Sequence, residues 1–321
     1  MTLNRRKFLQ KSVAAAAAVM AAPVLAMDGT AGVKNVGLQV WSIAKNLQSD
    51  FSGTLKLLQQ FGYKEIELFG PYPFSTEKDQ ASWKAVTSML NFSQSGYFGR
   101  SAKEFKKILN DHGLRTPAMH IGLDTLRNKM GETAEAAHAL GQQYAGIAAI
   151  PEEERRTMDD YKRIADDFNV IGEKAKANGI RFYYHNHGYG LTPIGGKIPF
   201  DVILERTDPT LVFLEMDLFW TVAGGADPVK YLDAHKGRYK LMHVKDMKER
   251  VRFAGDGGNA AQWVELFPHI TDAGSGVLDL KTILTHAKAS GVDHFFVEND
   301  RITDVKQSLE TSYKYLSSLE F

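Results

Sequence analysis

The segment KAKANGIRFYYHNHG, Lys174–Gly188, shows the unit from which the fold can be inferred. It begins as the end of an amphipathic helix, turns at Gly179 and continues as a short apolar run that ends in polar residues. A glycine just past a helix permits the left-handed conformation that ends it, and a run that is apolar on both faces is typical of a buried parallel strand. The segment therefore predicts a helix followed by a buried strand whose carboxyl end carries polar side chains.

The same unit recurs along the chain, with a glycine at each turn. It is found in Leu57–Gly70, Ile108–Gly122, His138–Ile150 and Thr285–Asp300. Strand candidates without that glycine are Val36–Ser42, Leu211–Phe219 and Lys240–Asp246. Eight strands that alternate with helices predict an α/β fold, a (β/α)8 TIM barrel in a single domain. A doubly wound open sheet is the alternative, and it is disfavoured because no G-x-G-x-x-G motif follows the first strand.

Residues 1–26 differ in composition from the rest and predict a twin-arginine signal peptide. Arg5 and Arg6 precede a weakly apolar stretch, Val13–Ala26, which falls short of the roughly 20 residues that span a bilayer. We therefore expect export to the periplasm, with residues 27–321 forming the barrel. A membrane-spanning or amphipathic helix is the alternative for this stretch. The chain has no cysteine, which is compatible with an oxidising compartment.

The charge of the chain after the leader argues against nucleic acid as the main partner. The chain has 39 basic and 38 acidic residues, and the leader holds four of the basic ones and no acid, which leaves a net charge of −3 for residues 27–321. Binding to a phosphate backbone requires a basic surface. We expect a small carbohydrate as the partner. We expect no binding to nucleic acid, and none to a membrane once the leader is removed. A homo-oligomer is possible.

Polar residues end each predicted strand, and in a TIM barrel these ends gather at one rim to form the active site. Strands five to eight each contribute one candidate metal ligand: His185, Asp217, His243 and Glu298. One such residue alone is more often structural, but four on adjacent strands predict one divalent metal ion. Nitrogen and oxygen ligands without sulfur suit Mn, Mg, Zn or Co. The insertion Pro71–Arg100, after the second strand, has the length of a functional lid.

Four late motifs resemble those of the xylose-isomerase-like family of sugar isomerases, epimerases and dehydratases. They are DLFWTVAGGADP (Asp217–Pro228), MHVKDM (Met242–Met247), DAGSGVLDL (Asp272–Leu280) and FFVEND (Phe295–Asp300). In that family Glu, Asp, His and Glu from strands five to eight typically hold the metal, and Asp217, His243 and Glu298 match the last three. The first position departs, because His185 stands where the isomerases carry Glu. A histidine can bind the metal, but it cannot easily replace one of the two carboxylates in a two-base proton shuttle. In having a histidine on strand five, the chain resembles the family's inosose dehydratases and related keto-sugar lyases.

The resemblance implies a metal-dependent sugar isomerase or epimerase that acts through an enediolate next to a sugar carbonyl. Loss of a β-substituent from the same enediolate gives the alternative, a keto-sugar dehydratase or keto-glycoside lyase. We expect Glu298 to serve as ligand and base, Lys245 to protonate or polarise an oxygen, and His187 to be the alternative base. A surface pair with Asp246 is the other interpretation of Lys245. Substrate contacts are expected from Trp41, Glu67, His120 and Trp220, with Phe69 and Tyr189 as further aromatic candidates.

Two other classes of protein remain as alternatives. An exported sugar-binding protein without catalysis would need the aromatic residues but not the metal ligands. A nuclease related to endonuclease IV shares the barrel, but it should show more histidine ligands for several zinc ions and a basic groove. The acidic charge of residues 27–321 disfavours the nuclease.

Overall fold

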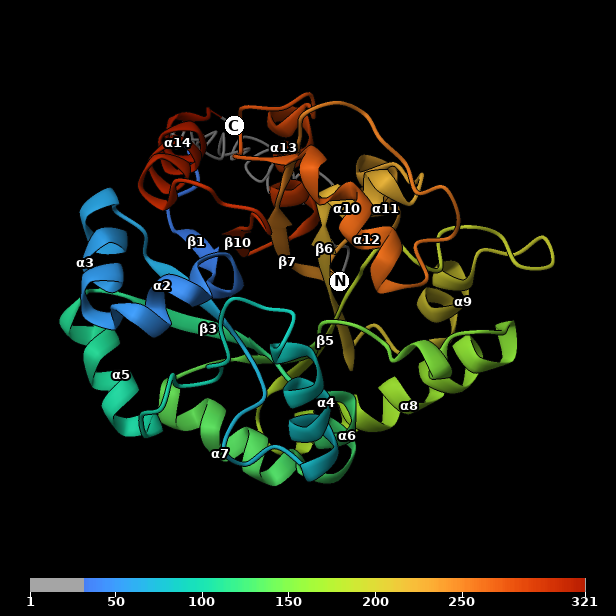
Figure 1. Ribbon diagram of the computed structural model, residues 1–321. Coiled ribbons are helices and arrows are strands. Elements are labelled where there is room, and N and C mark those ends of the chain that lie inside the picture. The colour runs from blue at the N-terminus through green and yellow to red at the C-terminus, as the bar shows by residue number, and fades with distance from the viewer. Residues whose placement is uncertain (1–31, 321) are drawn as a thin grey trace, which may run out of the picture. The chain divides into compact units, whose positions relative to one another are not determined.

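Figure 1 shows the computed structural model, which describes residues 32–320. Eight parallel strands close into a barrel in the order β1-β10-β7-β6-β5-β4-β3-β2. They are β1 (Val36–Gln39), β2 (Glu65–Phe69), β3 (Arg115–His120), β4 (Tyr144–Ile147), β5 (Arg181–His185), β6 (Val212–Asp217), β7 (Tyr239–Val244) and β10 (His294–Val297). The predicted TIM barrel is therefore confirmed. The predicted signal peptide, residues 1–26, lies outside the described residues.

Helices follow the strands and cover the outside of the barrel (Figure 1). The α-helices are α2 (Ala44–Ser49), α3 (Phe51–Phe61), α4 (Glu77–Thr87), α5 (Ala102–Asp111), α6 (Leu123–Asn128), α7 (Met130–Leu140), α8 (Met158–Ala177), α9 (Pro199–Arg206), α10 (Leu218–Ala223), α11 (Pro228–Ala234), α12 (Ala260–Leu266), α13 (Leu280–Ser290) and α14 (Val305–Ser318); short 3-10 helices are η1 (Val40–Ile43), η2 (Glu152–Glu154) and η3 (Phe267–His269). Gly62, Gly141 and Gly291 end α3, α7 and α13 with φ of 100°, 75° and 94°. Because other residues are strained at positive φ, glycine favours these turns from helix into strand.

Two strands end earlier than the sequence predicts, and both differences shape the rim. β1 ends at Gln39, whose side chain accepts a hydrogen bond from the Trp41 amide at 3.1 Å and caps the 3-10 helix η1. Trp41 therefore lies in a helical turn above the strand. β7 ends at Val244, so Lys245 follows the strand instead of lying within it.

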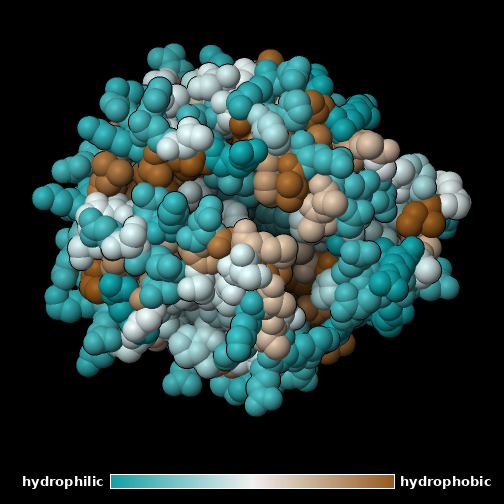
Figure 2. All heavy atoms as spheres, in the orientation of Figure 1, coloured by the Kyte–Doolittle hydropathy of each residue, from teal (hydrophilic) through white to brown (hydrophobic). Residues whose placement is uncertain are grey.

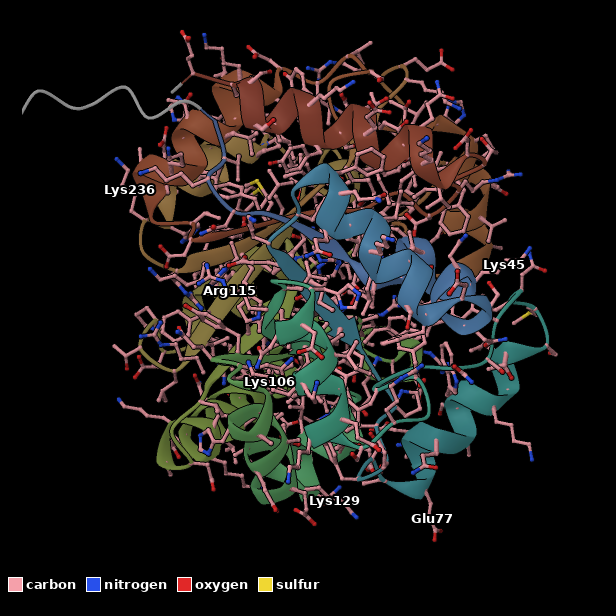
Figure 3. The ribbon with its side chains drawn as sticks, turned by 90° about the vertical axis from the view of Figure 1, so that its left-hand side faces the viewer. Lys45, Glu77, Lys106, Arg115, Lys129 and Lys236 are labelled. Atoms are coloured by element: carbon pink, nitrogen blue, oxygen red, sulfur yellow. The ribbon has the colours of Figure 1, made fainter. Side chains whose placement is uncertain are left out.

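The amino-terminal half of the barrel is filled by side chains. Its interior holds a separate apolar cluster of Ala118, Tyr144, Tyr183, Leu241 and Phe296. At the start of β2 and β3, the Nε of Arg115 donates a hydrogen bond to Glu65 at 2.8 Å. Figure 3 shows the direction of the barrel from the side: Arg115 and Lys236, which start or precede strands, lie opposite Lys45 and Glu77, which follow strands. The polar strand ends therefore gather at the second side.

Two segments outside the regular barrel pattern flank the rim. The insertion after β2 contains α4, a helix that the sequence analysis did not predict. The carboxylate of Asp79 on α4 accepts hydrogen bonds from the amide and hydroxyl of Thr125 at 2.8 and 2.6 Å, which holds α4 against α6, the helix that follows β3. The other segment contains α12 and is bounded by β8 (Asp246–Met247) and β9 (Ile270–Thr271), which pair antiparallel. In Figure 1, α4 lies below the barrel centre and α12 lies to its right.

Among the described residues, no helix combines the length and the apolar character needed to cross a membrane.

Candidate active site

The carboxyl ends of the strands enclose a cavity of about 470 Å³. In Figure 2 this face of the molecule is hollowed near its centre, with hydrophobic residues beside the hollow. Polar residues that line the cavity are Gln39, Asp79, Ser82, His120, His185, His187, His243, Lys245, Glu298 and Asp300. Aromatic residues that line it are Trp41, Phe69, Trp83, Trp220, Trp263 and Phe267. The volume lies in the range of about 300–1,000 Å³ that is usual for small-molecule sites.

The buried ammonium group of Lys245 is surrounded by three carboxylates. Its Nζ lies 2.8 Å from Glu298 Oε2, 2.8 Å from Asp300 Oδ2 and 3.1 Å from Asp217 Oδ2. Burial opposes the charge, but the carboxylates outweigh it and raise the pKa of Lys245 well above its usual value. Lys245 therefore stays positively charged at neutral pH. It does not form a surface pair with Asp246, whose carboxylate instead accepts hydrogen bonds from backbone amides of the loop before α13.

His243 contacts carboxylates through both ring nitrogens. Nδ1 lies 2.7 Å from Glu298 Oε2 and 3.8 Å from Asp217 Oδ2. Nε2 lies 2.6 Å from Glu67 Oε2 and 3.3 Å from Glu215 Oε1. Burial opposes a charged ring, but the carboxylates, Glu215 foremost, raise the pKa of His243 well above its usual value. Without a metal ion, His243 is therefore a charged imidazolium that links two groups of carboxylates.

His185 belongs to a different group from the other predicted ligands. Its Nδ1 lies 3.1 Å from Glu215 Oε2, and the same oxygen lies 2.9 Å from His120 Nε2. Burial and the neighbouring His243 lower the pKa of His185 to about 3, so its ring is neutral. The described residues thus offer two donor sets that share His243: Asp217, His243 and Glu298, and His120, His185, Glu215 and His243.

The donor atoms of these sets suit a divalent cation. Asp217 Oδ2 and Glu215 Oε1 are buried and accept no hydrogen bond, although each lies at an ion-pair distance from a cation, Lys245 Nζ at 3.1 Å and His243 Nε2 at 3.3 Å. A buried carboxylate oxygen without such a partner is unfavourable, and a cation would satisfy it. The set with Asp217 and Glu298 is rich in oxygen and suits Mn or Mg, whereas the set with three imidazoles suits Zn.

His187 lies in a stack of aromatic rings along one wall of the cavity. Its ring centre is 4.5 Å from that of Trp263 and 5.7 Å from that of Trp220, with the planes 23° and 29° apart. Its Nδ1 is buried without a hydrogen-bond partner. Burial, together with His185 and Lys245, holds the pKa of His187 well below its usual value. The ring of His187 is therefore neutral at neutral pH.

His120 lines the same cavity, and its pKa is shifted in the opposite direction. Burial opposes a charged ring, but the carboxylates of Glu67 and Glu215 outweigh it and raise the pKa of His120 above its usual value. The ring centres of His120 and His185 are 5.2 Å apart, and those of His185 and His187 are 5.3 Å apart. The three imidazoles thus form a row in which the pKa is raised at one end, at His120, and lowered at the other, at His187.

The predicted aromatic contacts are partly reproduced at the cavity. Trp41 lines it together with Phe69 and Trp83, whose ring centres lie 5.2 and 6.2 Å from that of Trp41. The indole N–H of Trp83 donates a hydrogen bond to the carbonyl of Ser93 at 2.9 Å. Trp83 can therefore contact a ligand through the face of its ring but not through this N–H. Trp220 also lines the cavity, below the ammonium of Lys245, which lies 5.3 Å from its ring centre.

Two predicted substrate contacts are not among the lining residues. Glu67 is fully buried, and its oxygens accept hydrogen bonds from Tyr183 at 2.6 Å and from Gln39 at 2.7 Å in addition to His243. It therefore positions His243 instead of meeting a sugar hydroxyl. Tyr189 is also buried, and its hydroxyl accepts a hydrogen bond from the Ile150 amide at 2.8 Å.

Sequence reasoning assigned no role to four residues of this site. Glu215 and Asp300 lie two residues from Asp217 and Glu298, so the two-residue repeat of a strand was a signal that could have found them. Trp83 and Trp263 come from the two segments outside the barrel pattern. The sequence gives no periodic signal that would place those two rings at the rim.

Comparisons with known proteins agree with this architecture. Residues 55–314 match the family described as xylose isomerase-like TIM barrel. An inosose dehydratase of Clostridium tetani is 32% identical over 127 residues, which are 39% of this chain and 41% of that protein. An inosose dehydratase of Geobacillus thermodenitrificans is 26% identical over 238 residues, 66% of this chain and 78% of that protein.

A solved structure shares the fold over most of both chains. The sugar phosphate isomerase/epimerase from Parabacteroides distasonis superposes with a TM-score of 0.69 at 24% identity, over 91% of this chain and 96% of its own. The closed barrel, the polar rim and the family match over residues 55–314 lead to one conclusion: this chain belongs to the xylose isomerase-like TIM barrel family.

Proposed function

We propose that this protein removes water from a keto-sugar or a cyclitol ketone by metal-dependent β-elimination, starting at the C–H bond next to the carbonyl. One observation carries the proposal: two imidazoles line one cavity with pKa values displaced in opposite directions, that of His187 downward and that of His120 upward. Paired groups whose environments push their pKa values apart mark the base and the acid of a site. Elimination needs both, because one group takes the carbon-bound proton and another gives a proton to the leaving hydroxyl.

In this proposal each residue of the chain has a defined task. The neutral ring of His187 accepts the C–H proton, and charged His120 protonates the hydroxyl, which leaves as water. Lys245 keeps its own proton because its pKa is raised, so it stabilises negative charge on a substrate oxygen and is not the acid. A divalent ion held by Asp217, His243 and Glu298 would supply Lewis-acid polarisation of the carbonyl. Trp41 and Trp220 would cover the apolar face of the ring.

The relatives support the reaction type and suggest the first substrates to test. The matched proteins of Clostridium tetani and Geobacillus thermodenitrificans are named inosose dehydratases. The aligned segment spans about two-fifths of the Clostridium tetani protein. That this chain shares the activity of the whole relative is therefore part of the proposal. Inososes are cyclitol ketones, and they carry a hydroxyl on the carbon β to the carbonyl, next to the carbon that bears the acidic C–H bond.

Isomerisation or epimerisation is the second candidate, because it begins with the same proton removal. Glu298 favours it: Lys245 and His243 outweigh burial and hold the pKa of this carboxyl well below its usual value, so it is ionised. An ionised carboxylate that lines the cavity could exchange a proton with the substrate without loss of the hydroxyl.

Two variants separate the acid from the base. In deuterated water with an inosose, followed by NMR, His187→Gln should lose both C–H exchange and elimination. His120→Gln should keep exchange but lose elimination by about 10²–10⁴-fold, the usual size of a general-acid contribution. His286→Gln, at an exposed Asp–His pair on α13, is the matched control and should behave as wild type. Elimination at the wild-type rate in His120→Gln contradicts the proposal, and exchange without water loss in wild type favours the epimerase.

A further inference from the structure

Lys245 occupies the oxygen atoms that a metal ion would need. Asp217 Oδ2 and Glu298 Oε2 both lie near His243 Nδ1, at 3.8 and 2.7 Å, which is what makes these three residues a candidate ion site. The ammonium of Lys245 lies 3.1 and 2.8 Å from the same two oxygens. Its side chain is 1% exposed, so water screens this charge little.

A divalent ion and this ammonium cannot both hold those oxygens closely. Metal–oxygen bonds are about 2.0–2.6 Å long, which would bring two cations into near contact inside a buried pocket. The repulsion between like charges grows as the dielectric falls. Either the ion binds weakly, or Lys245 withdraws from Asp217 and Glu298.

Asp300 gives the ammonium a place to withdraw to. Its Oδ2 lies 2.8 Å from Lys245 Nζ, and Asp300 is not part of the candidate ion site. The side chain of Asp300 is only 10% exposed, so it gives the ammonium of Lys245 a largely buried partner. A lysine has a flexible four-carbon stem and a compact charge, so a small shift of the ammonium needs no backbone movement. Both Lys245 and Asp300 line the cavity.

We propose that Lys245 is a movable internal counter-ion, which neutralises Asp217 and Glu298 when no ion is bound and shifts fully onto Asp300 when a divalent ion binds. This inference rests on the ion in the proposed function. Lys245 then lowers the affinity for the ion, Asp300 raises it, and neither residue is a ligand. Ion binding also leaves the ammonium beside Asp300 at the cavity wall, where it can act on a substrate oxygen.

A double-mutant cycle on Mn²⁺ affinity, measured by titration calorimetry, tests the shift. Lys245→Met should bind Mn²⁺ about tenfold or more tightly than wild type, and Asp300→Asn about tenfold less tightly. In the Lys245→Met background, Asp300→Asn should change the affinity by less than about threefold, because no ammonium is left to move. Groups in one ion-pair network typically couple by about 2- to 150-fold. Lys240→Met is the matched control. It also removes one lysine charge, but from β7 itself, where the ammonium of Lys240 donates a hydrogen bond to the Gly291 carbonyl. This variant should leave the Mn²⁺ affinity unchanged.

Two results overturn the inference. One is an additive cycle, in which Asp300→Asn weakens binding equally in both backgrounds, as a fixed lysine would give. The other is unchanged or weaker binding in Lys245→Met. Wild type that binds no Mn²⁺ overturns the metal centre of the proposed function as well, so the two failures are distinguishable.

A crystal structure of the Mn²⁺-loaded wild type tests the same point without depending on how any variant folds. We expect Lys245 Nζ within hydrogen-bond distance of Asp300 and more than about 4 Å, the ion-pair limit, from Asp217 Oδ2 and Glu298 Oε2. A loaded structure in which Nζ keeps both of these oxygens contradicts the shift.

Discussion

Nδ1 of His243 lies 2.7 Å from Oε2 of Glu298. The other ring nitrogen lies 2.6 Å from Glu67 Oε2, so both nitrogens face a carboxylate and the ring is charged when no ion is bound. A metal ion needs a nitrogen lone pair, which only the deprotonated ring has. Ion binding at Asp217, His243 and Glu298 must therefore expel a proton.

We accordingly predict release of about one proton per bound Mn²⁺ at neutral pH. The raised pKa of His243 means that the ring holds its proton throughout the range below that pKa. Affinity should therefore rise with pH there and fall about tenfold for each unit by which the pH drops. Calorimetric titrations in two buffers with different heats of ionisation count the protons. A heat that is the same in both buffers, or an affinity that does not depend on pH, would refute this charge assignment.

Asp217→Asn should weaken Mn²⁺ binding by more than about 100-fold, beyond the 10–100-fold typical of groups that merely support a ligand. The substitution keeps the fold, because Asp217 Oδ1 caps α10 by accepting a hydrogen bond from the Trp220 amide at 2.9 Å, and an asparagine oxygen can do the same. Elemental analysis and calorimetry give the result. Asp233→Asn, at the exposed pair with His286, is the control and should bind as wild type. Full ion content in Asp217→Asn would place the ion elsewhere, with the imidazole set around Glu215 the first alternative.

His185→Glu should keep the ion but slow elimination. The new carboxylate would replace the His185 ring, whose Nδ1 lies 3.1 Å from Glu215. It would make the surroundings of the ion more anionic, and the ion would then polarise the substrate carbonyl less. Interconversion of substrate stereoisomers could then gain from the added base, and general-base effects of about 10²–10⁴-fold make either change measurable. Product analysis by NMR, with His185→Ala as the control, separates the two reactions. If both variants keep wild-type rate and ion content, His185 is not part of the site.

Replacement of Arg5 and Arg6 by lysine should retain the protein in the cytoplasm with residues 1–26 attached. The prediction follows from the arginine pair before a weakly apolar stretch, which is typical of the twin-arginine route. Cell fractionation and the mass of the recovered protein measure it. Normal periplasmic recovery of the double variant would rule out this route.

The barrel could be predicted from the sequence because its signals are local. Three helices end at a glycine and are followed by a run that is apolar on both faces, so Gly62, Gly141 and Gly291 mark real turns. The strand ends also predict which residues share the rim, since parallel strands bring their carboxyl ends to one edge. For this reason the sequence predicts that Asp217, His243 and Glu298 share one rim.

The grouping of side chains within the rim could not be predicted in the same way. His185 ends the correct strand, but its ring hydrogen-bonds to Glu215 and so joins His120. The depth of Glu67, whose oxygens are held by Gln39, Tyr183 and His243, depends on contacts between strands that are far apart in sequence. The helix α4 is not predictable in this way because none of its residues is buried, so its sequence carries no apolar stripe.

The most direct test of the account is the ion dependence of C–H exchange. Purified protein is stripped with EDTA, reloaded with Mn²⁺ or left bare, and given an inosose in deuterated water while NMR follows the proton next to the carbonyl. The account predicts loss of that signal together with water elimination in the loaded protein, neither in the stripped protein, and full recovery on reloading. Exchange at the same rate with and without the ion, or no exchange by protein that has bound Mn²⁺, would contradict it.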